Sequence, residues 1–165
     1  MRRAQLVLMG ALLAVAAAVA GGATAAETET HKMIAADRVE WGPAPPGLPP
    51  GSQAAVLSGN PAAEGPFTLR AKLPDGYRVP PHWHGTVENL TVLSGTMHMG
   101  MGDTVDPARE TAMKPGDFAA MPAGTRHWVR AEGDVVLQVH GVGPFSITYV
   151  DPADDPRRQA AGATR

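Results

Sequence analysis

The feature that most constrains the fold is a series of short apolar runs separated by glycine and proline. The expected strands are residues 53–57, 67–73, 87–93, 96–101, 117–121, 127–131, 135–140 and 145–150. The breaks between them, such as PDG at 74–76 and PAG at 122–124, supply the backbone conformations that tight turns need. No run has the 3.6-residue period of an amphipathic helix, so the pattern predicts an all-β sandwich or barrel.

The N-terminus has the layout of a secretory signal peptide. Arg2 and Arg3 precede an apolar run over 6–20, and small residues up to Ala26 fit a peptidase site. An uncleaved membrane anchor is the alternative, but this run is shorter than the ~20 residues that a span needs. We therefore predict a periplasmic or secreted protein without a stable membrane anchor, exported by the general route. The twin-arginine route is the alternative, although the residues after Arg3 lack the aromatic residue expected there.

Charge and cysteine content narrow the partners. The 165 residues carry a net charge of −2 and no cysteine, which excludes disulfides and a lipid-modified cysteine. Cleavage after Ala26 would remove two positive charges and no negative one, which changes −2 to −4. An acidic protein has no electrostatic field suited to nucleic acid, so a small-molecule ligand or substrate is the expected partner.

The chain is expected to contain one folded domain, at residues 52–150. Residues 1–26 are the predicted signal peptide, 27–51 an N-terminal arm and proline-rich connector, and 151–165 a flexible C-terminal tail. Residues 37–41 could form a first short strand. Five prolines between residues 41 and 51 forbid a helix or a central strand there, so the connector should lie extended against the domain.

Four side chains have the types and spacing of a metal site. His82 and His84 are two residues apart, so they point to the same face of an extended strand, and Glu88 shares their parity. His127 follows the turn at 122–124 and begins another strand. Three nitrogen donors and one carboxylate suit a divalent transition metal with positions left for water or substrate, and do not suit calcium or magnesium.

In these residues the sequence resembles the cupin superfamily. Its first motif is matched, at every spacing, by Gly76, His82, His84, Glu88 and Gly95. The glycine, proline, glycine and histidine of its second motif are matched by the residues at 116, 122, 124 and 127; alanine at 131 replaces the motif's frequent asparagine. The resemblance covers about residues 66–150.

This resemblance implies a single-domain cupin β-barrel, a jelly roll of two antiparallel sheets. It implies the same ligands, His82, His84, Glu88 and His127, for one divalent ion, which could be Fe, Mn, Zn, Cu or Ni. It also makes a homodimer a reasonable expectation. The motif glycines at 95, 116 and 124 are expected to close hairpins at the barrel mouth.

Other polar residues are candidates for the surroundings of the metal. Gln138 and His140 share one face of a strand and could face solvent or a polar cavity, where His140 would be an acid–base group or a partner of a metal ligand. Arg70 and Arg78 are weak candidates for binding a substrate carboxylate, as are the arginines at 126 and 130.

Further residues are expected to play structural roles. Met97, Met99 and Met101 lie on the face opposite His98; core packing is the expected role of these methionines, and a copper(I) surface is the alternative. The tryptophans at 83 and 128 alternate with ligands and should point away from the metal. His31 is expected to be a solvated residue of the arm.

Three classes of function remain open, because cupin barrels carry many chemistries. The first is a metal-dependent enzyme acting on a small organic molecule, with dioxygenase-like oxidoreductase chemistry slightly favoured. The second is a non-catalytic periplasmic protein that binds a small ligand or a metal. In the third, the metal has only a structural role.

Overall fold

The computed structural model describes residues 31–158. Contacts divide the chain into residues 1–33 and 34–165. In the first unit only residues 31–33 are described; they have no regular secondary structure, and His31 is exposed, as expected. The predicted signal peptide lies outside the described residues. Within them, no helix combines the length and hydropathy needed to cross a bilayer.

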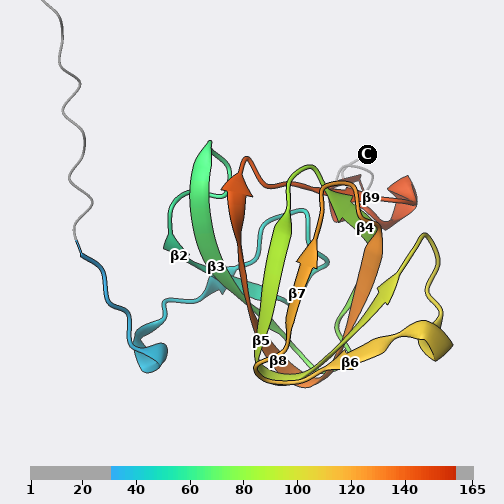
Figure 1. Ribbon diagram of the computed structural model, residues 1–165, viewed down its shortest axis with the longest axis horizontal. Helices are drawn as coiled ribbons and strands as arrows, with labels where there is room; N and C mark the ends of the chain where they lie inside the picture. Colours follow the sequence, from blue (N-terminus) through green and yellow to red (C-terminus); the bar gives the residue numbers. More distant parts are fainter. Residues whose placement is uncertain (1–30, 159–165) are drawn as a thin grey trace, which may run out of the picture. The chain divides into compact units, whose positions relative to one another are not determined.

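The second unit is a curled antiparallel β-sheet (Figure 1). Its strands are β1 (Gly42–Pro43), β2 (Gln53–Ser58), β3 (Gly65–Leu73), β4 (Arg78–His84), β5 (Glu88–Met101), β6 (Thr111–Met113), β7 (Phe118–Met121), β8 (His127–Gly143) and β9 (Ile147–Tyr149). The order is β1-β2-β3-β8-β4-β9, and β5 pairs with β6, β7 and β8. Because β5 and β8 pair with strands on both sides of the barrel, the two expected sheets form one continuous network.

The core is formed by alternate residues of these strands. In β3, Phe67, Ala71 and Leu73 are buried while the intervening residues are more exposed, and in β8 the buried series is Val135, Leu137 and Val139. This is the period of two that a strand with one apolar face requires. The apolar runs in the sequence therefore predict both the strands and their inward faces.

Gly95 reverses the inward parity of β5. Glu88 and Leu90 point inward before it, whereas Met97 and Met99 do so after it. The change coincides with register shifts between Val92, Ser94 and Thr96 in the pairing with β8. A Cβ atom on Gly95 would lie 2.3 Å from the Asp134 carbonyl oxygen, so glycine permits the close approach of the two strands.

Several expected boundaries are wrong. Residues 37–41 do not form a strand; the 3-10 helix η1 (Ala36–Arg38) occupies part of them, and the first strand is β1. Gly95 does not close a hairpin, and the break at 132–134 does not end β8, because both strands bend and continue. Strand β6 lies outside the expected apolar runs. By contrast, Gly116 and Gly124 do occupy turns, with φ of 96° and 78°.

The proline-rich connector packs against the barrel. Tyr149 donates a buried hydrogen bond of 2.8 Å to the Gly47 carbonyl oxygen, and Tyr77 donates one of 2.5 Å to that of Pro49. Burial raises the pKa of both tyrosines, so the hydroxyls stay neutral donors at ordinary pH.

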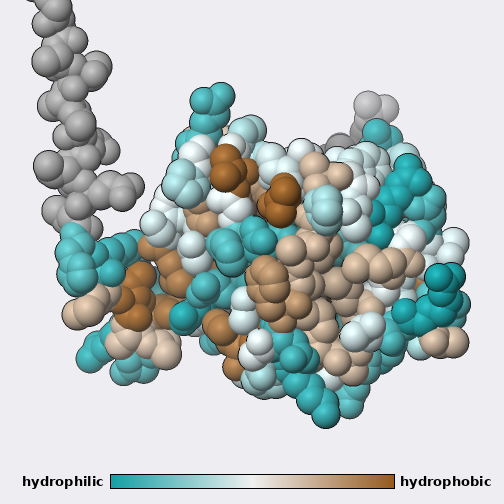
Figure 2. All heavy atoms as spheres, in the orientation of Figure 1, coloured by the Kyte–Doolittle hydropathy of each residue, from teal (hydrophilic) through white to brown (hydrophobic). Residues whose placement is uncertain are grey.

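The C-terminal segment is partly ordered. After η2 (Pro107–Arg109) in the β5–β6 connection, η3 (Pro152–Asp154) follows β9. Arg157 donates a hydrogen bond of 3.0 Å to the Ile147 carbonyl oxygen and pairs with Asp155. The first half of the expected tail is therefore attached to β9, and residues 159–165 lie outside the described residues. Figure 2 shows apolar side chains interspersed with polar ones on one face of the molecule.

Candidate metal centre

Strand β4 presents His82 and His84 to the barrel interior. Both side chains are buried, while Trp83 between them is more exposed on the other face. A register shift between Val79 and His82 sets this face, and β9 pairs with the same segment of β4. The structure thus places the two histidines on a common face, as the i, i+2 spacing predicts.

Glu88 and His127 enter the same space from the first residues of β5 and β8. His127 is the register partner of His82 across the β4–β8 pairing. The turn before His127 is tied to the end of β4, because the Gly124 amide donates a 2.9 Å hydrogen bond to the His84 carbonyl oxygen. Backbone pairing therefore brings together residues that are 45 positions apart, His82 and His127.

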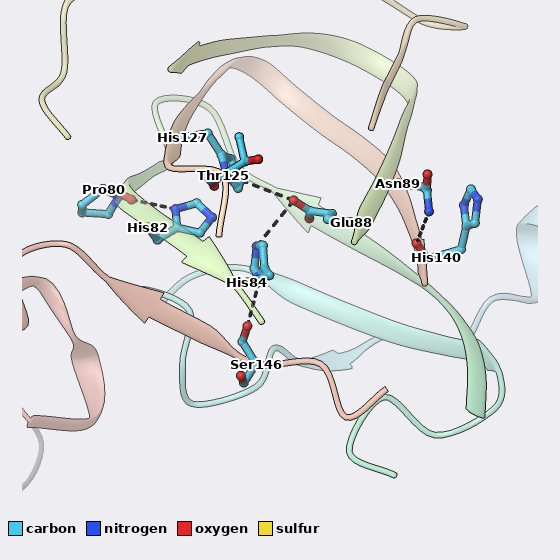
Figure 3. Close-up of polar contacts among 9 residues, drawn as sticks. All are labelled: Pro80, His82, His84, Glu88, Asn89, Thr125, His127, His140 and Ser146. Atoms are coloured by element: carbon cyan, nitrogen blue, oxygen red, sulfur yellow. Dashed lines mark hydrogen bonds and ion pairs between the residues drawn. The ribbon is translucent and has the colours of Figure 1, made fainter. Parts of the chain in front are cut away.

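The four side chains converge, as Figure 3 shows. One ligating atom from each of His82, His84 and His127 lies within 4.8 Å of the others, so this buried cluster could hold a metal ion. Glu88 Oε2 lies 3.4 Å from His84 Nε2 and 3.3 Å from His127 Nε2. All four side chains are buried.

Backbone carbonyls fix the tautomer of each histidine. The Nδ1 atoms of His82, His84 and His127 lie 2.7, 2.8 and 3.0 Å from the carbonyl oxygens of Pro80, Ser146 and Thr125. Since a carbonyl oxygen only accepts, each Nδ1 carries the proton and donates it. In the neutral form of such a ring, Nε2 directs its lone pair into the cluster, which is the form that binds a metal.

Burial keeps the β4 histidines neutral. It lowers the pKa of His82 well below the ordinary value, with a further lowering by His127 and His84. Burial likewise lowers the pKa of His84, although Glu88 opposes this. A neutral His84 forms no ion pair with Glu88, although the two side chains are 3.4 Å apart.

The cluster has the charge and the free acceptors that a cation would satisfy. Among the described residues, His84 Nε2 and Glu88 Oε2 are buried atoms that have no hydrogen-bond partner. Such atoms are costly in a protein interior unless something satisfies them. A cation between the acceptors would do so, and the donor set of three imidazoles and one carboxylate fits a divalent transition metal.

The cluster forms one wall of a cavity of about 160 Å³. Twenty residues line it, of which only His82, His84, Glu88 and His127 have polar side chains. The other sixteen are aliphatic, aromatic, proline or glycine residues, including Leu48 of the connector. The candidate metal ligands therefore adjoin a space large enough for a small organic molecule.

Phe145 is a site residue that the sequence did not reveal. Its ring stacks on His84, with centroids 4.3 Å apart and an interplanar angle of 17°, and it lines the cavity. Phe145 is 61 positions from His84 and belongs to no motif. The same holds for the connector residues Pro45, Gly47 and Leu48, whose apolar character was the only signal available.

The outer candidates lie away from the cavity. Gln138 and His140 are on the face of β8 opposite Leu137 and Val139, which line it. Gln138 accepts a 3.3 Å hydrogen bond from Arg70. The alternative in which Gln138 and His140 project into a polar cavity is therefore wrong, because the β8 parity points them outward.

The candidate arginines do not line the cavity either. Arg78 is exposed at the start of β4. Arg126 pairs with Asp103 at 2.7 Å, and Arg130 pairs with Glu110. Neither Arg70 nor Arg78, the weak candidates for binding a substrate, lines the cavity beside the histidines.

His98 and the methionines lie as the core interpretation predicts, with one exception. Met97 and Met99 are buried in the core, whereas Met101 is 55% exposed beyond it. His98 lies on the outer face, with Nδ1 2.9 Å from Glu110 and Nε2 2.6 Å from Glu132. Only Met97 of the three lines the cavity beside the histidines.

The tryptophans also point away from the metal cluster. The Arg126 guanidinium lies over the Trp83 ring, and its Cζ atom is 5.7 Å from the centroid of that ring. Trp128 is 2% exposed and packs on Gly100, where a Cβ atom would be 2.2 Å from the indole. Neither residue lines the cavity.

Comparison with known proteins agrees with this geometry. The family model for the cupin domain matches residues 69–143, which include all four converging side chains. These residues form a cupin domain. A germin-like protein (subfamily 2 member 1) of Arabidopsis thaliana is 33% identical over 86 residues, which are 52% of this chain and 36% of the relative. The match thus spans about a third of that plant protein.

Solved structures share the cupin fold. The polyketide cyclase RemF of Streptomyces resistomycificus superposes with a TM-score of 0.63 at 20% identity, covering 80% of this chain and 94% of that one. An RmlC-like cupin of Shewanella frigidimarina gives 0.53 at 15% identity, covering 68% and 91%. At sequence identities this low, the similarity between these structures and this protein concerns the fold alone.

Proposed function

We propose that this cupin binds one divalent transition metal through His82, His84, Glu88 and His127. The proposal is supported by the short distances among the ligating atoms of the three histidines, which lie within 4.8 Å of one another, and by the lack of a hydrogen-bond partner for His84 Nε2 and Glu88 Oε2. The Nδ1 hydrogen bonds to backbone carbonyls would hold the imidazoles in the binding tautomer. Iron, manganese, zinc, copper and nickel all accept this donor set.

We further propose that the protein is a metal-dependent enzyme acting on a small organic molecule. The observation that carries this proposal is the cavity of about 160 Å³ directly beside the four candidate ligands. A purely structural metal is usually closed off by its protein ligands, whereas a catalytic one keeps a position for water or substrate. The cavity therefore favours chemistry over a role in stability alone.

The cavity residues would supply binding and exclusion of water. A bound redox-active metal would supply Lewis acidity or reaction with dioxygen, and dioxygenase-like chemistry is the form we favour slightly. Phe145 and the connector would form part of the wall around a substrate, and the apolar lining would keep bulk water from the reacting groups.

The experiment is metal analysis and turnover with the purified protein. We expect about one metal ion per chain in the wild type and in His98→Ala, and much less in His82→Ala. Oxygen uptake would then be measured with a panel of enol, diol and phenolic substrates. Metal binding and ligand binding without product would support a non-catalytic binding protein instead. Absence of bound metal from every loading condition would contradict the proposal.

We also propose that the protein is exported and cleaved after Ala26. Support comes from the sequence of residues 1–26. The mature protein recovered from the periplasm or medium should begin at Glu27, as intact mass will show. A homodimer is proposed on the family resemblance, and light scattering of the metal-loaded protein tests it.

A further inference from the structure

The side chains that line the cavity are polar only at the four converging residues. Apart from the four converging residues, it offers a substrate no side-chain hydrogen bond and no charge. The arginines that could have bound an anion are elsewhere: Arg70 bonds Gln138, and Arg126 and Arg130 pair with acidic residues. A ligand in this space can therefore form hydrogen bonds with side chains only at the histidine end.

We propose that the cavity takes neutral molecules the size of one ring, with their oxygen donors at the histidine end, and rejects carboxylates. The inference rests on the proposed function for the location of the oxygen donors. It goes further by specifying the rest of the molecule, which must be apolar because residues such as Leu69, Leu137 and Val139 line that part of the cavity.

The volume sets the size of the ligand. An apolar protein cavity of about 150 Å³ holds a benzene molecule. The cavity of about 160 Å³ here is of that size, so it accommodates one substituted ring rather than a fused system. The Phe145 ring, which stacks on His84, offers the ring of the ligand an aromatic surface next to the candidate metal ligands.

The charge rule follows from desolvation. An ionised carboxylate that leaves water without a partner carries a large energetic cost. If a dihydroxybenzoate directs its hydroxyls to the histidines, its carboxylate faces leucine and valine. If it turns around, the two hydroxyls lose their partners instead. Both orientations are therefore unfavourable, whereas a methyl group in place of the carboxylate is not.

The test compares 4-methylcatechol with 3,4-dihydroxybenzoate, which differ only in the methyl and carboxylate groups. Binding is measured by calorimetry to the Co²⁺-loaded and the metal-free protein at pH 7.5. In each form of the protein that binds 4-methylcatechol, we expect this neutral compound to bind at least about 30-fold more tightly than 3,4-dihydroxybenzoate. Equal affinities, tighter binding of the carboxylate, or no binding of either compound would overturn the inference.

A pair of variants tests whether the lining is responsible. Leu48→Arg places a cation in the cavity wall, and Leu93→Arg places one on the exposed outer face of β5. We expect Leu48→Arg to reduce the preference about tenfold and Leu93→Arg to leave it unchanged; the same effect of both would contradict a role of the lining. If Leu48→Arg does not fold, the wild-type comparison decides alone.

The Co²⁺ absorption spectrum separates the two proposals. A cobalt spectrum without ligand preference refutes the neutral-ring inference and leaves the metal site standing. Preference in the metal-free protein, where the Nε2 atoms accept from the catechol hydroxyls, combined with no cobalt binding, refutes the metal site and leaves the inference standing.

Discussion

The Gly124 amide donates a hydrogen bond of 2.9 Å to the His84 carbonyl oxygen, which joins the turn before His127 to the end of β4. Gly124 has a φ of 78°, a conformation that L-residues other than glycine adopt at a cost of about 1–2 kcal/mol. The backbone between two of the candidate metal ligands therefore depends on one glycine.

We predict that Gly124→Ala lowers both stability and metal affinity. Strain in the turn would weaken its bond to His84 and displace His127. Gly116→Ala is the matched control, because Gly116 also has positive φ, at 96°, in a turn that bonds β5 instead. Both variants should melt at a lower temperature by calorimetry, but only Gly124→Ala should bind Co²⁺ more weakly. Equal metal affinities would refute the link.

Glu88→Gln should have opposite effects on the two forms of the protein. The amide can donate to His84 or His127, so the buried oxygen without a partner is replaced by a satisfied group. We expect the metal-free variant to gain roughly 1 kcal/mol. The metal-loaded variant should lose affinity, because a charged ligand is gone. Melting temperatures with a chelator measure the stability of the metal-free form, and those without it measure the stabilisation by metal. A destabilised metal-free variant would contradict this account.

The stability of the metal-free protein should decrease as the pH falls below about 6.5. The pKa values of His82 and His84 are lowered in the folded state, so the unfolded chain binds more protons in the range between the folded and the ordinary values. Stability then rises with pH there, by up to about 1.4 kcal/mol per pH unit for each histidine. Urea unfolding from pH 5 to 7.5 tests this slope.

His82→Gln is the control for the pH slope. Glutamine does not titrate, so the variant should lose part of the dependence. An unchanged slope between pH 5 and 6.5 would show that other groups are responsible.

Tyr149→Phe should loosen the connector. The lost hydrogen bond to the Gly47 carbonyl oxygen leaves a buried acceptor unsatisfied, at a cost of about 1–3 kcal/mol. Because Gly47 and Leu48 line the cavity, we expect faster proteolysis within residues 43–52 and faster ligand dissociation. If the variant is cleaved at the same rate as the wild type, the hydrogen bond does not hold the connector in place.

Gly95→Ala should be far more disruptive than Gly76→Ala. Both glycines have positive φ and belong to the same motif, but a Cβ on Gly95 would meet Asp134 backbone at 2.3 Å, while one on Gly76 meets nothing within 4 Å. We expect a loss above about 3 kcal/mol at Gly95 and about 1–2 kcal/mol at Gly76. Denaturant unfolding of the metal-free proteins gives both values.

The sequence by itself determined the class of fold and the common face of His82 and His84. The period of two in the apolar runs predicts inward faces, because side chains alternate along any strand. The i, i+2 spacing of His82 and His84 puts two imidazoles on one side for the same reason. These are local properties of an extended backbone, so they can be inferred before the strand neighbours are known.

Only the tertiary structure decided what surrounds the four residues. Gln138 and His140 share a face in any strand, but whether that face is inside depends on which side of β8 the rest of the sheet covers. Phe145 meets His84, and Gly47 meets Tyr149, across 61 and 102 positions. Such contacts arise from strand order and from bends such as that at Gly95, and no local pattern encodes them.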